Sequence, residues 1–262
     1  MQGMQRLFFG LEVDSPWPSF YPEGRLISEK QRHITLAFLG FVDPTALQKS
    51  IEKIPLPSFS IGPVGFCDQL LFLPEERPRT VSWHIEWLSE ERELSGYRVE
   101  LLHWLDKLGY RTDRRPFLPH LTIARTPFKR EEWEGFSSQP FITKALHLYE
   151  SIGNLHYPSR WQFPLEPAFE EFEHTADLAF SVRASNLQQL YLHAALALSF
   201  KFPPLIAYLK RPNNKTIGDF FDVISALNEL IAVADQEQGC PFKAVSYHGQ
   251  FKENSWEMIV DV

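Results

Sequence analysis

Two short segments, far apart in the chain, carry the same pair of side chains that could act on a phosphate ester. One is His33-Ile34-Thr35 and the other is His120-Leu121-Thr122. Two imidazoles can serve as acid and base near neutral pH, and threonine hydroxyls can donate hydrogen bonds to phosphoryl oxygens. A single His-x-Thr on a strand is most often structural, whereas a second copy in the same context favours a paired catalytic site.

The residues around both segments predict β-strands that aim these side chains. Alternate side chains of a strand share a face, so His33 and Thr35 point one way, and His120 and Thr122 likewise. The intervening residues are apolar and can enter a core. Two such strands placed side by side would make a four-cornered polar site of two imidazoles and two hydroxyls.

The other predicted strands and helices of the first part occur in a similar order before and after its midpoint. Strands are predicted at 6–13, 33–40, 58–66, 68–73, 81–87, 120–125 and 141–150, and helices at 44–53 and 89–108. Asp43 is expected to cap the first helix with Pro44 at its first position, and Gly109 to end the second. Two similar halves, each with one His-x-Thr strand, predict a duplicated α+β domain with a central cleft.

Composition bounds the class of protein. A chain of 262 residues with 44% hydrophobic residues can hold one large domain or two modest ones. The net charge of −7 argues against non-specific binding of duplex nucleic acid. Cys67 and Cys240 lie far apart and outside any C-x-x-C, which makes a metal cage or disulfide framework unexpected. Without a signal-peptide pattern or an apolar run of roughly 18 residues, a cytoplasmic protein with no membrane association is expected.

The motifs of residues 4–165 resemble those of the 2H phosphoesterases, and more narrowly of the RNA 2′,3′-cyclic phosphodiesterases, also called 2′–5′ RNA ligases. The matching segments, in family order, are R-L-F-F-G-L-E-V, H-I-T-L-A-F-L-G, G-Y-R-T-D-R-R-P-F-L-P-H-L-T-I-A-R and L-H-L-Y-E-S-I-G-N-L-H-Y. The resemblance implies a bilobal fold over residues 1–166. It departs from the family in the Pro-rich stretch 15–24, where a helix is expected.

The resemblance implies an activity and its residues. RNA ending in a 2′,3′-cyclic phosphate is the expected substrate, opened without a cofactor to a 2′-phosphomonoester, with 2′–5′ joining as the reverse reaction. His33 and His120 would be the acid and base, and Thr35, Thr122 and Arg125 would hold the phosphoryl group. Weaker candidates for RNA contacts are Arg114, Arg115, Lys129, Phe38, Phe117 and Tyr157.

Residues 167–262 change in character and resemble archease, a small α+β protein that its family pairs with the RNA ligase of tRNA splicing. The matching residues are E-H-T-A-D (173–177), K-A-V-S-Y-H (243–248) and W-E-M-I-V-D-V (256–262). A strand-like alternation at 170–184, helices at 187–200, capped by Asn186, and at 219–234, and a C-terminal hairpin are expected. The region between the helices is shorter than in archeases.

The archease resemblance implies a divalent cation, Ca²⁺ or Mg²⁺, at Asp177 and Asp261 and an RNA ligase as partner. The alternative for these acids is that they are solvated residues at strand ends. Two other functions stay open for the whole chain. It could be an accessory binding factor for a ligase with secondary phosphoesterase activity, or a phosphodiesterase of small cyclic nucleotides such as ADP-ribose 1″,2″-cyclic phosphate.

Overall fold

The computed structural model describes residues 3–113, 115–174, 177–210, 217–247 and 249–262. The first part of the chain contains β1 (Gln5–Asp14), β2 (Arg25–Leu26), β3 (His33–Val42), α1 (Thr45–Ser50), β4 (Val64–Leu73), β5 (Thr80–Trp87), α2 (Glu91–Lys107), β6 (His120–Arg125), β7 (Gln139–Glu150) and β8 (Ser159–Pro164). The second contains β9 (Phe169–Phe172), β10 (Leu178–Arg183), α3 (Leu187–Lys201), α4 (Ile206–Leu209), α5 (Phe220–Gln238), β11 (Ala244–Val245) and β12 (Ser255–Asp261). Short 3₁₀ turns lie at Glu29–Gln31, Ile51–Lys53, Arg130–Trp133 and Pro203–Leu205.

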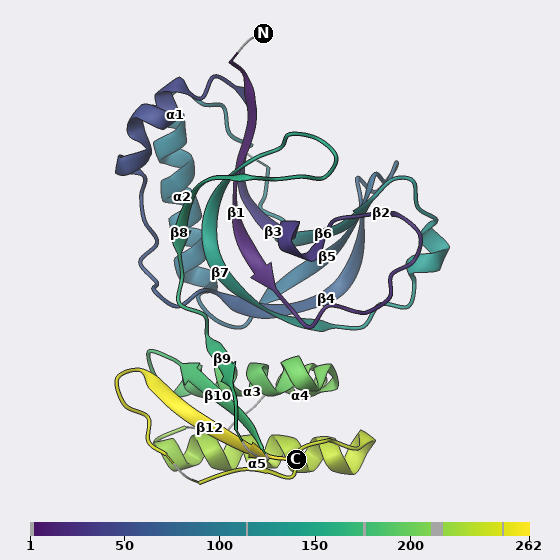
Figure 1. Ribbon diagram of the computed structural model, residues 1–262, viewed down its shortest axis with the longest axis vertical. Helices are drawn as coiled ribbons and strands as arrows, with labels where there is room; N and C mark the ends of the chain where they lie inside the picture. The colour runs from purple at the N-terminus through teal and green to yellow at the C-terminus, as the bar shows by residue number, and fades with distance from the viewer. Residues whose placement is uncertain (1–2, 114, 175–176, 211–216, 248) are drawn as a thin grey trace.

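A barrel-like ring of strands dominates the first part (Figure 1). Over the described residues, the strand order β1-β3-β6-β5-β4-β7 closes on itself because β1 pairs with β7 as well as with β3. β8 extends the sheet beside β7, and β2 pairs with β6. The α+β class is confirmed, and over the described residues the strands of the first part join in one continuous sheet. The two His-x-Thr strands, β3 and β6, are neighbours in that sheet.

Alternating apolar residues explain why β3 and β6 are held in place. Ile34, Leu121 and Ile123 are fully buried on one side of the strands, while the residues between them stay accessible. Burial of each such side chain contributes about 1.5–3 kcal/mol. A slip by one residue would move this apolar set to the wrong face, so the register is strongly specified.

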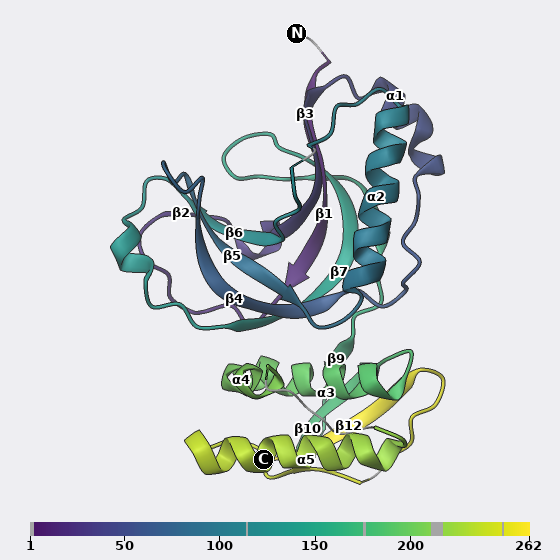
Figure 2. The ribbon, with the colours of Figure 1, turned by 180° about the vertical axis from the view of Figure 1, so that it is seen from behind.

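Helices α1 and α2 lie together against one side of the ring (Figures 1 and 2). Helix α2 confirms the helix predicted at 89–108, and its residues Leu94, Tyr97, Leu101 and Leu105 form a buried apolar stripe. Gly109 follows this helix with a φ of +87°, a left-handed conformation that favours glycine.

Two sequence expectations in this part were wrong in detail. Residues 58–73 hold one described strand, β4, rather than two. It runs through the boundary between the predicted strands with a register shift between Cys67 and Leu70. The first helix begins at Thr45 and not at Pro44. Asp43 still fills the role of a cap, because its Oδ1 accepts a 2.9 Å hydrogen bond from the Thr45 N–H.

The second part is a four-stranded antiparallel sheet in the order β11-β12-β10-β9, over the described residues, with α3 and α5 packed together. Asn186 caps α3 as predicted, accepting from the Gln189 N–H at 2.9 Å. The stretch predicted as one strand at 170–184 instead forms two, β9 and β10, which pair with each other. Helix α5 runs four residues further than predicted, to Gln238. The expected C-terminal hairpin pairing is present between β11 and β12.

The two sheets share a hydrophobic core. Ile61, Val64 and Ile142, all from the first part, are buried in the same cluster as the apolar faces of α3 and α5. At the same junction the Ser89 hydroxyl lies 3.2 Å from Nε2 of His193, a fully buried residue of α3.

No helix among the described residues is long and apolar enough to cross a membrane. Cys67 and Cys240 are both free thiols.

Candidate active site

The structure brings both His-x-Thr pairs to one cavity. β3 and β6 run antiparallel with Ile34 opposite Leu121, so His33 lies diagonally across from His120, and Thr35 from Thr122. All four side chains border a cavity of about 340 Å³. Its other lining residues are Arg6, Phe8, Arg25, Ile27, Phe38, Leu73, Thr80, Arg125, Ser151, Gly153, Asn154, Leu155 and Tyr157.

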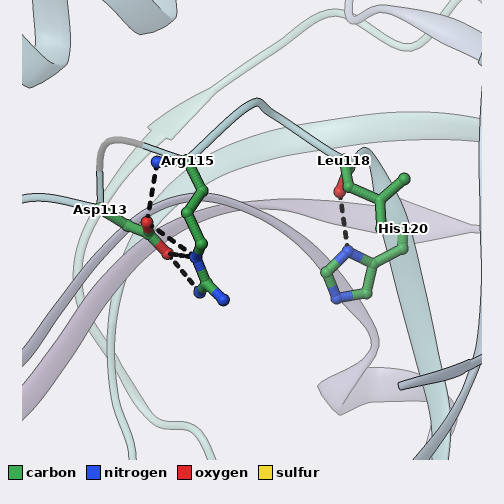
Figure 3. A network of polar contacts seen from close by, with 4 residues as sticks. All are labelled: Asp113, Arg115, Leu118 and His120. Carbon is green, nitrogen blue, oxygen red and sulfur yellow. Dashed lines mark hydrogen bonds and ion pairs between the residues drawn. The ribbon is translucent and has the colours of Figure 1, made fainter. Parts of the chain in front are cut away.

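Matching backbone contacts orient the two imidazoles. Nδ1 of His33 lies 2.7 Å from the carbonyl oxygen of Gln31, and Nδ1 of His120 lies 2.8 Å from that of Leu118 (Figure 3). A carbonyl oxygen can only accept, so each Nδ1 carries a proton. Each Nε2 is therefore left to exchange a proton with a bound molecule, as acid or as base.

Aromatic rings surround His33. Its ring centroid is 4.7 Å from that of Phe8, 5.2 Å from Tyr149 and 4.9 Å from Tyr157. This desolvation disfavours the imidazolium and, with smaller contributions from the nearby charges of Arg125 and His120, lowers the pKa of His33 from 6.5 to about 4. At neutral pH the ring is uncharged in the free protein.

The low pKa of His33 predicts activity well below neutral pH. An imidazole pair works with one ring neutral and one protonated, and each ring then contributes one limb to a bell-shaped dependence of kcat/KM on pH. Because the pKa of His33 is about 4, its limb is expected near pH 4 and the rate should rise with pH through that value. A profile measured on a cyclic phosphate from about pH 3.5 upward checks this; an acidic limb near the ordinary histidine value would contradict it.

A buried serine supports one of the threonines. Ser82 is fully buried on β5, directly opposite Thr122, and its hydroxyl donates to Thr122 Oγ1 at 3.2 Å. Since this bond uses a lone pair of Thr122 Oγ1, the hydroxyl proton of Thr122 remains available to a ligand in the cavity. Sequence reasoning missed Ser82, because its partner lies 40 positions further along the chain.

The cavity is suited to an anion. Arg6, Arg25 and Arg125 border it, and no Asp or Glu stands among its described lining residues. Nε of Arg125 is buried and has no hydrogen-bond partner among the described residues. A buried N–H without a partner costs free energy, so a phosphoryl oxygen that accepts from Arg125 would relieve that cost and add a charge-assisted bond.

The weaker candidates for RNA contacts divide into two groups. Phe38 and Tyr157 border the cavity. Arg115 is instead bound to Asp113 at 2.5 Å, where it lowers the pKa of that carboxyl to about 2 (Figure 3). Lys129 pairs with Glu132 at 2.8 Å, and Phe117 lies under the guanidinium of Arg98. Arg114 lies outside the described residues.

A histidine–glutamate pair, His147 and Glu12, lies close to the aromatic residues around His33, and sequence reasoning missed it. His147 is buried, with Nε2 3.0 Å from a Glu12 carboxylate oxygen, and its ring stacks on Tyr149 at 4.8 Å. The hydrogen bond from His147 is the largest of the causes that lower the pKa of Glu12. Tyr149 thus lies between this pair and His33.

The carboxylates predicted to bind metal lie at matching positions but do not by themselves fit a hard cation. Extension of the β10–β12 register places Asp177 across from Asp261. Asp177 Oδ2 is 3.7 Å from His174 Nδ1, and Asp261 Oδ1 is 3.6 Å from Lys243 Nζ. Ca²⁺ takes six to eight oxygen ligands, and no group of three or more metal-binding side chains is found in the described part of the chain. Thr175 and His248 of the archease-like motifs lie outside the described residues.

Comparison with known proteins gives partial matches. No protein-family model matches the chain. An RNA 2′,3′-cyclic phosphodiesterase of Geobacillus stearothermophilus is 34% identical over 122 residues, covering 46% of this chain and 35% of that protein. The same-named protein of Thermotoga maritima is 31% identical over 115 residues, 41% of this chain and 57% of that one. The chain therefore spans well under two thirds of the length of the curated relatives it matches.

Two further curated relatives, of Archaeoglobus fulgidus and Bacillus subtilis, carry the same name. Among solved structures, Escherichia coli LigT complexed with 3′-AMP aligns with 62% of this chain and 98% of its own at 22% identity and a TM-score of 0.44. Apo LigT gives a TM-score of 0.46 at 20% identity, over 63% of this chain and 99% of its own. Scores below 0.5 do not by themselves establish a common fold.

Proposed function

We propose that this protein hydrolyses the 2′,3′-cyclic phosphate at the end of an RNA strand to a 2′-phosphomonoester. The observation that carries the proposal is the cavity that joins both His–Thr pairs with the unpartnered Nε of Arg125. Such a site supplies two proton carriers and several donors to phosphoryl oxygens, which are the groups that the reaction needs. The names of the curated relatives point the same way.

The proposed reaction moves two protons. One imidazole takes a proton from water as the water oxygen bonds to phosphorus. The P–O3′ bond then breaks, and the other imidazole gives its proton to O3′, which leaves a 2′-phosphate and a 3′-hydroxyl. Thr35, Thr122 and Arg125 would stabilise the charge on the non-bridging oxygens. With an RNA 5′-hydroxyl in place of water, the same steps, with P–O3′ cleavage, form a 2′–5′ linkage.

Analogy within the superfamily makes His120 the base and His33 the acid. Since His33 is uncharged in the free protein at neutral pH, it would gain its proton together with the substrate, whose phosphoryl charge favours the imidazolium. The mechanism requires no metal ion, so loss of turnover in EDTA would contradict it.

Exposed aromatic residues beside the cavity favour an RNA strand over a small cyclic nucleotide. Phe41 is 71% exposed and stands opposite Arg6 across β1 and β3. The guanidinium of Arg6 lies 5.3 Å from the Phe38 ring and 5.9 Å from the Phe41 ring. Arg6 and Phe38 also border the cavity. Together Phe38, Arg6 and Phe41 form a cationic stacking platform, which suits successive bases of a single strand.

Substrate comparison tests the proposal. RNA ending in a 2′,3′-cyclic phosphate should be hydrolysed with a higher kcat/KM than ADP-ribose 1″,2″-cyclic phosphate, and the product should carry its phosphate on O2′. Faster turnover of the small nucleotide would favour the second phosphodiesterase function instead. A 3′-phosphate product would contradict the proposed bond cleavage.

Removal of the Phe41 ring should lower kcat/KM for long RNA substrates but not for short ones. Phe41→Ala is expected to lower kcat/KM for an RNA oligonucleotide about tenfold, because one base loses a stacking partner worth about 1–3 kcal/mol. A mononucleoside 2′,3′-cyclic phosphate, which does not reach Phe41, should be hydrolysed as before. Phe221→Ala, an exposed ring on α5, is the control. Equal losses on both substrates would contradict a strand-binding role for Phe41.

For residues 167–262 we propose, from the archease resemblance, assistance to a separate RNA ligase. The supporting residues are the E-H-T-A-D and W-E-M-I-V-D-V segments with Asp177 and Asp261. Co-purification of the full chain with a ligase, lost in the double variant Asp177→Asn, Asp261→Asn, would support an accessory role. Calorimetric titration with Ca²⁺ and Mg²⁺ tests the metal prediction on the same pair of proteins.

A further inference from the structure

A second cavity, also of about 340 Å³, lies apart from the catalytic one. It is bordered mainly by aromatic rings of the loop 14–24, of β5 and of the segment before β7: Phe20, Tyr21, Trp83, Trp133 and Phe136. The linings of the two cavities share no residue. Trp83 directly follows Ser82, whose hydroxyl reaches Thr122, and successive side chains of a strand point to opposite faces. The aromatic cavity therefore opens on the other face of β5.

The rings in this cavity are arranged so that a planar ligand could stack on them, and we call this group of rings the aromatic slot. Tyr21 and Trp83 are stacked with centroids 6.4 Å apart and an interplanar angle of 28°. Tyr21 also lies 6.3 Å from Trp133, and Trp83 lies 5.6 Å from Phe136. Phe20, at the edge, is 81% exposed. A large apolar ring left in water beside other rings has an open face on which a planar group can stack.

One polar group in this lining has no partner. Gln139 is 8% exposed and borders the cavity. Its Oε1 is buried without a hydrogen bond among the described residues, and its Nε2 is 3.5 Å from the Ser137 carbonyl oxygen, at the limit of a hydrogen bond. A buried amide left in this state costs free energy unless a ligand completes it. A ligand that offers a donor next to an acceptor would satisfy both ends of the amide.

The lining of this cavity offers an anionic ligand no cationic side chain. Its described lining residues include no Lys or Arg and one carboxylate, Glu132, which pairs with Lys129 at 2.8 Å. A phosphate would thus find no counter-charge here, in contrast to the catalytic cavity with its three arginines. The volume lies at the small end of the roughly 300–1,000 Å³ that small-molecule sites occupy.

We propose that this aromatic slot binds a neutral nucleobase, with adenine preferred. The rings would stack on the base, and the amide of Gln139 would pair with the adjacent amino group and ring nitrogen of adenine, a pairing that glutamine makes readily. A free nucleoside and a base within an RNA strand present the same edge to the amide. This site is independent of the proposed phosphodiesterase activity, because it lies on another face and uses other residues.

Titration of the full-length protein with adenosine tests the proposal. Binding should quench tryptophan fluorescence, because two of the seven tryptophans, Trp83 and Trp133, border the slot. Gln139→Leu, which keeps the size and removes the amide, should raise the Kd for adenosine about tenfold or more. Phe20→Ala should also raise it, and as this ring is exposed its loss does not disturb the core. Phe221→Ala is the control and should bind as the wild type does.

Further ligands distinguish a free nucleoside from a base within an RNA strand, and the aromatic slot from the catalytic cavity. AMP should bind more weakly than adenosine if the slot lacks a counter-charge. Competition by oligo(A), but not by oligo(U), would identify a base within a strand as a ligand, and absence of competition would identify the free nucleoside. Kd values unchanged in both Gln139→Leu and Phe20→Ala, or no quenching by millimolar adenosine, would overturn the proposal. Hydrolysis of a mononucleoside cyclic phosphate should be unchanged in Phe20→Ala, so failure here is distinguishable from failure of the catalytic proposal.

Discussion

A His120→Ala variant is expected to hydrolyse an RNA 2′,3′-cyclic phosphate about 10²- to 10⁴-fold more slowly than the wild type, which is the usual contribution of a positioned acid or base. His33→Ala should lose a comparable factor, because turnover needs both imidazoles. Single-turnover rates at saturating substrate measure the effect on the chemical step. His103→Ala, which removes an exposed imidazole from α2, is the matched control. Activity preserved in either His33→Ala or His120→Ala would remove that residue from the mechanism.

A change of leaving group separates the acid from the base. In a substrate with sulfur in place of O3′, the departing thiolate needs no proton, so the variant that lacks the acid should regain most of its rate. The variant that lacks the base should stay slow, since water must still be activated. The superfamily analogy predicts recovery for His33→Ala. Recovery for His120→Ala instead would reverse the two roles, and it would agree with the low pKa of His33 in the free protein.

Arg125→Met is the second change with a large expected effect. The buried Nε of Arg125 has no partner in the described protein, so its bond to a phosphoryl oxygen would form on binding and strengthen as charge builds. Loss of one such donor costs roughly 10²–10³ in rate. We expect kcat/KM to fall by that factor, with Arg125→Lys recovering only part of it, because an ammonium lacks the planar pair of donors.

A nearby arginine provides the comparison for Arg125. Arg115 stands on the loop that leads to His120, yet its guanidinium is bound to Asp113 and 86% exposed (Figure 3). Arg115→Met removes the same charge from the same part of the protein and should change kcat/KM little. Equal losses in the two variants would show that general positive charge, rather than a contact from Arg125, attracts the substrate.

The strand pattern predicted the geometry around His33, Thr35, His120 and Thr122 because a period of two fixes which side chains share a face. It could not predict the surroundings of His33. Phe8, Tyr149 and Tyr157 come from β1, β7 and the loop after it, and the closing of the ring through β1 and β7 brings them together. Local sequence does not encode that closure, so the lowered pKa of His33 could not be predicted from the sequence.

Other differences arise from one long-range contact and from two short-range charge pairs. Residues 58–63 alternate polar and apolar residues at their start, but they form only a single bridge, from Ile61 to Glu166, and no strand. Arg115 and Lys129 were plausible contacts for RNA from charge alone. Acidic neighbours two and three residues away, Asp113 and Glu132, bind them in the structure. Short-range charge pairs of this kind can be read from a sequence and should lower the expectation of a ligand contact.

The core shared by the two sheets has a consequence for how the protein unfolds. Ile61, Val64 and Ile142 are covered by α3 and its neighbours, so a cut near residue 166 would leave these side chains in water and remove support from β4 and β7. Those strands belong to the ring that holds His33 and His120. We therefore expect heat to melt the chain in one cooperative transition. The first part, with its proposed phosphodiesterase site, should depend on residues 167–262 for folding even where those residues contribute nothing to the chemistry.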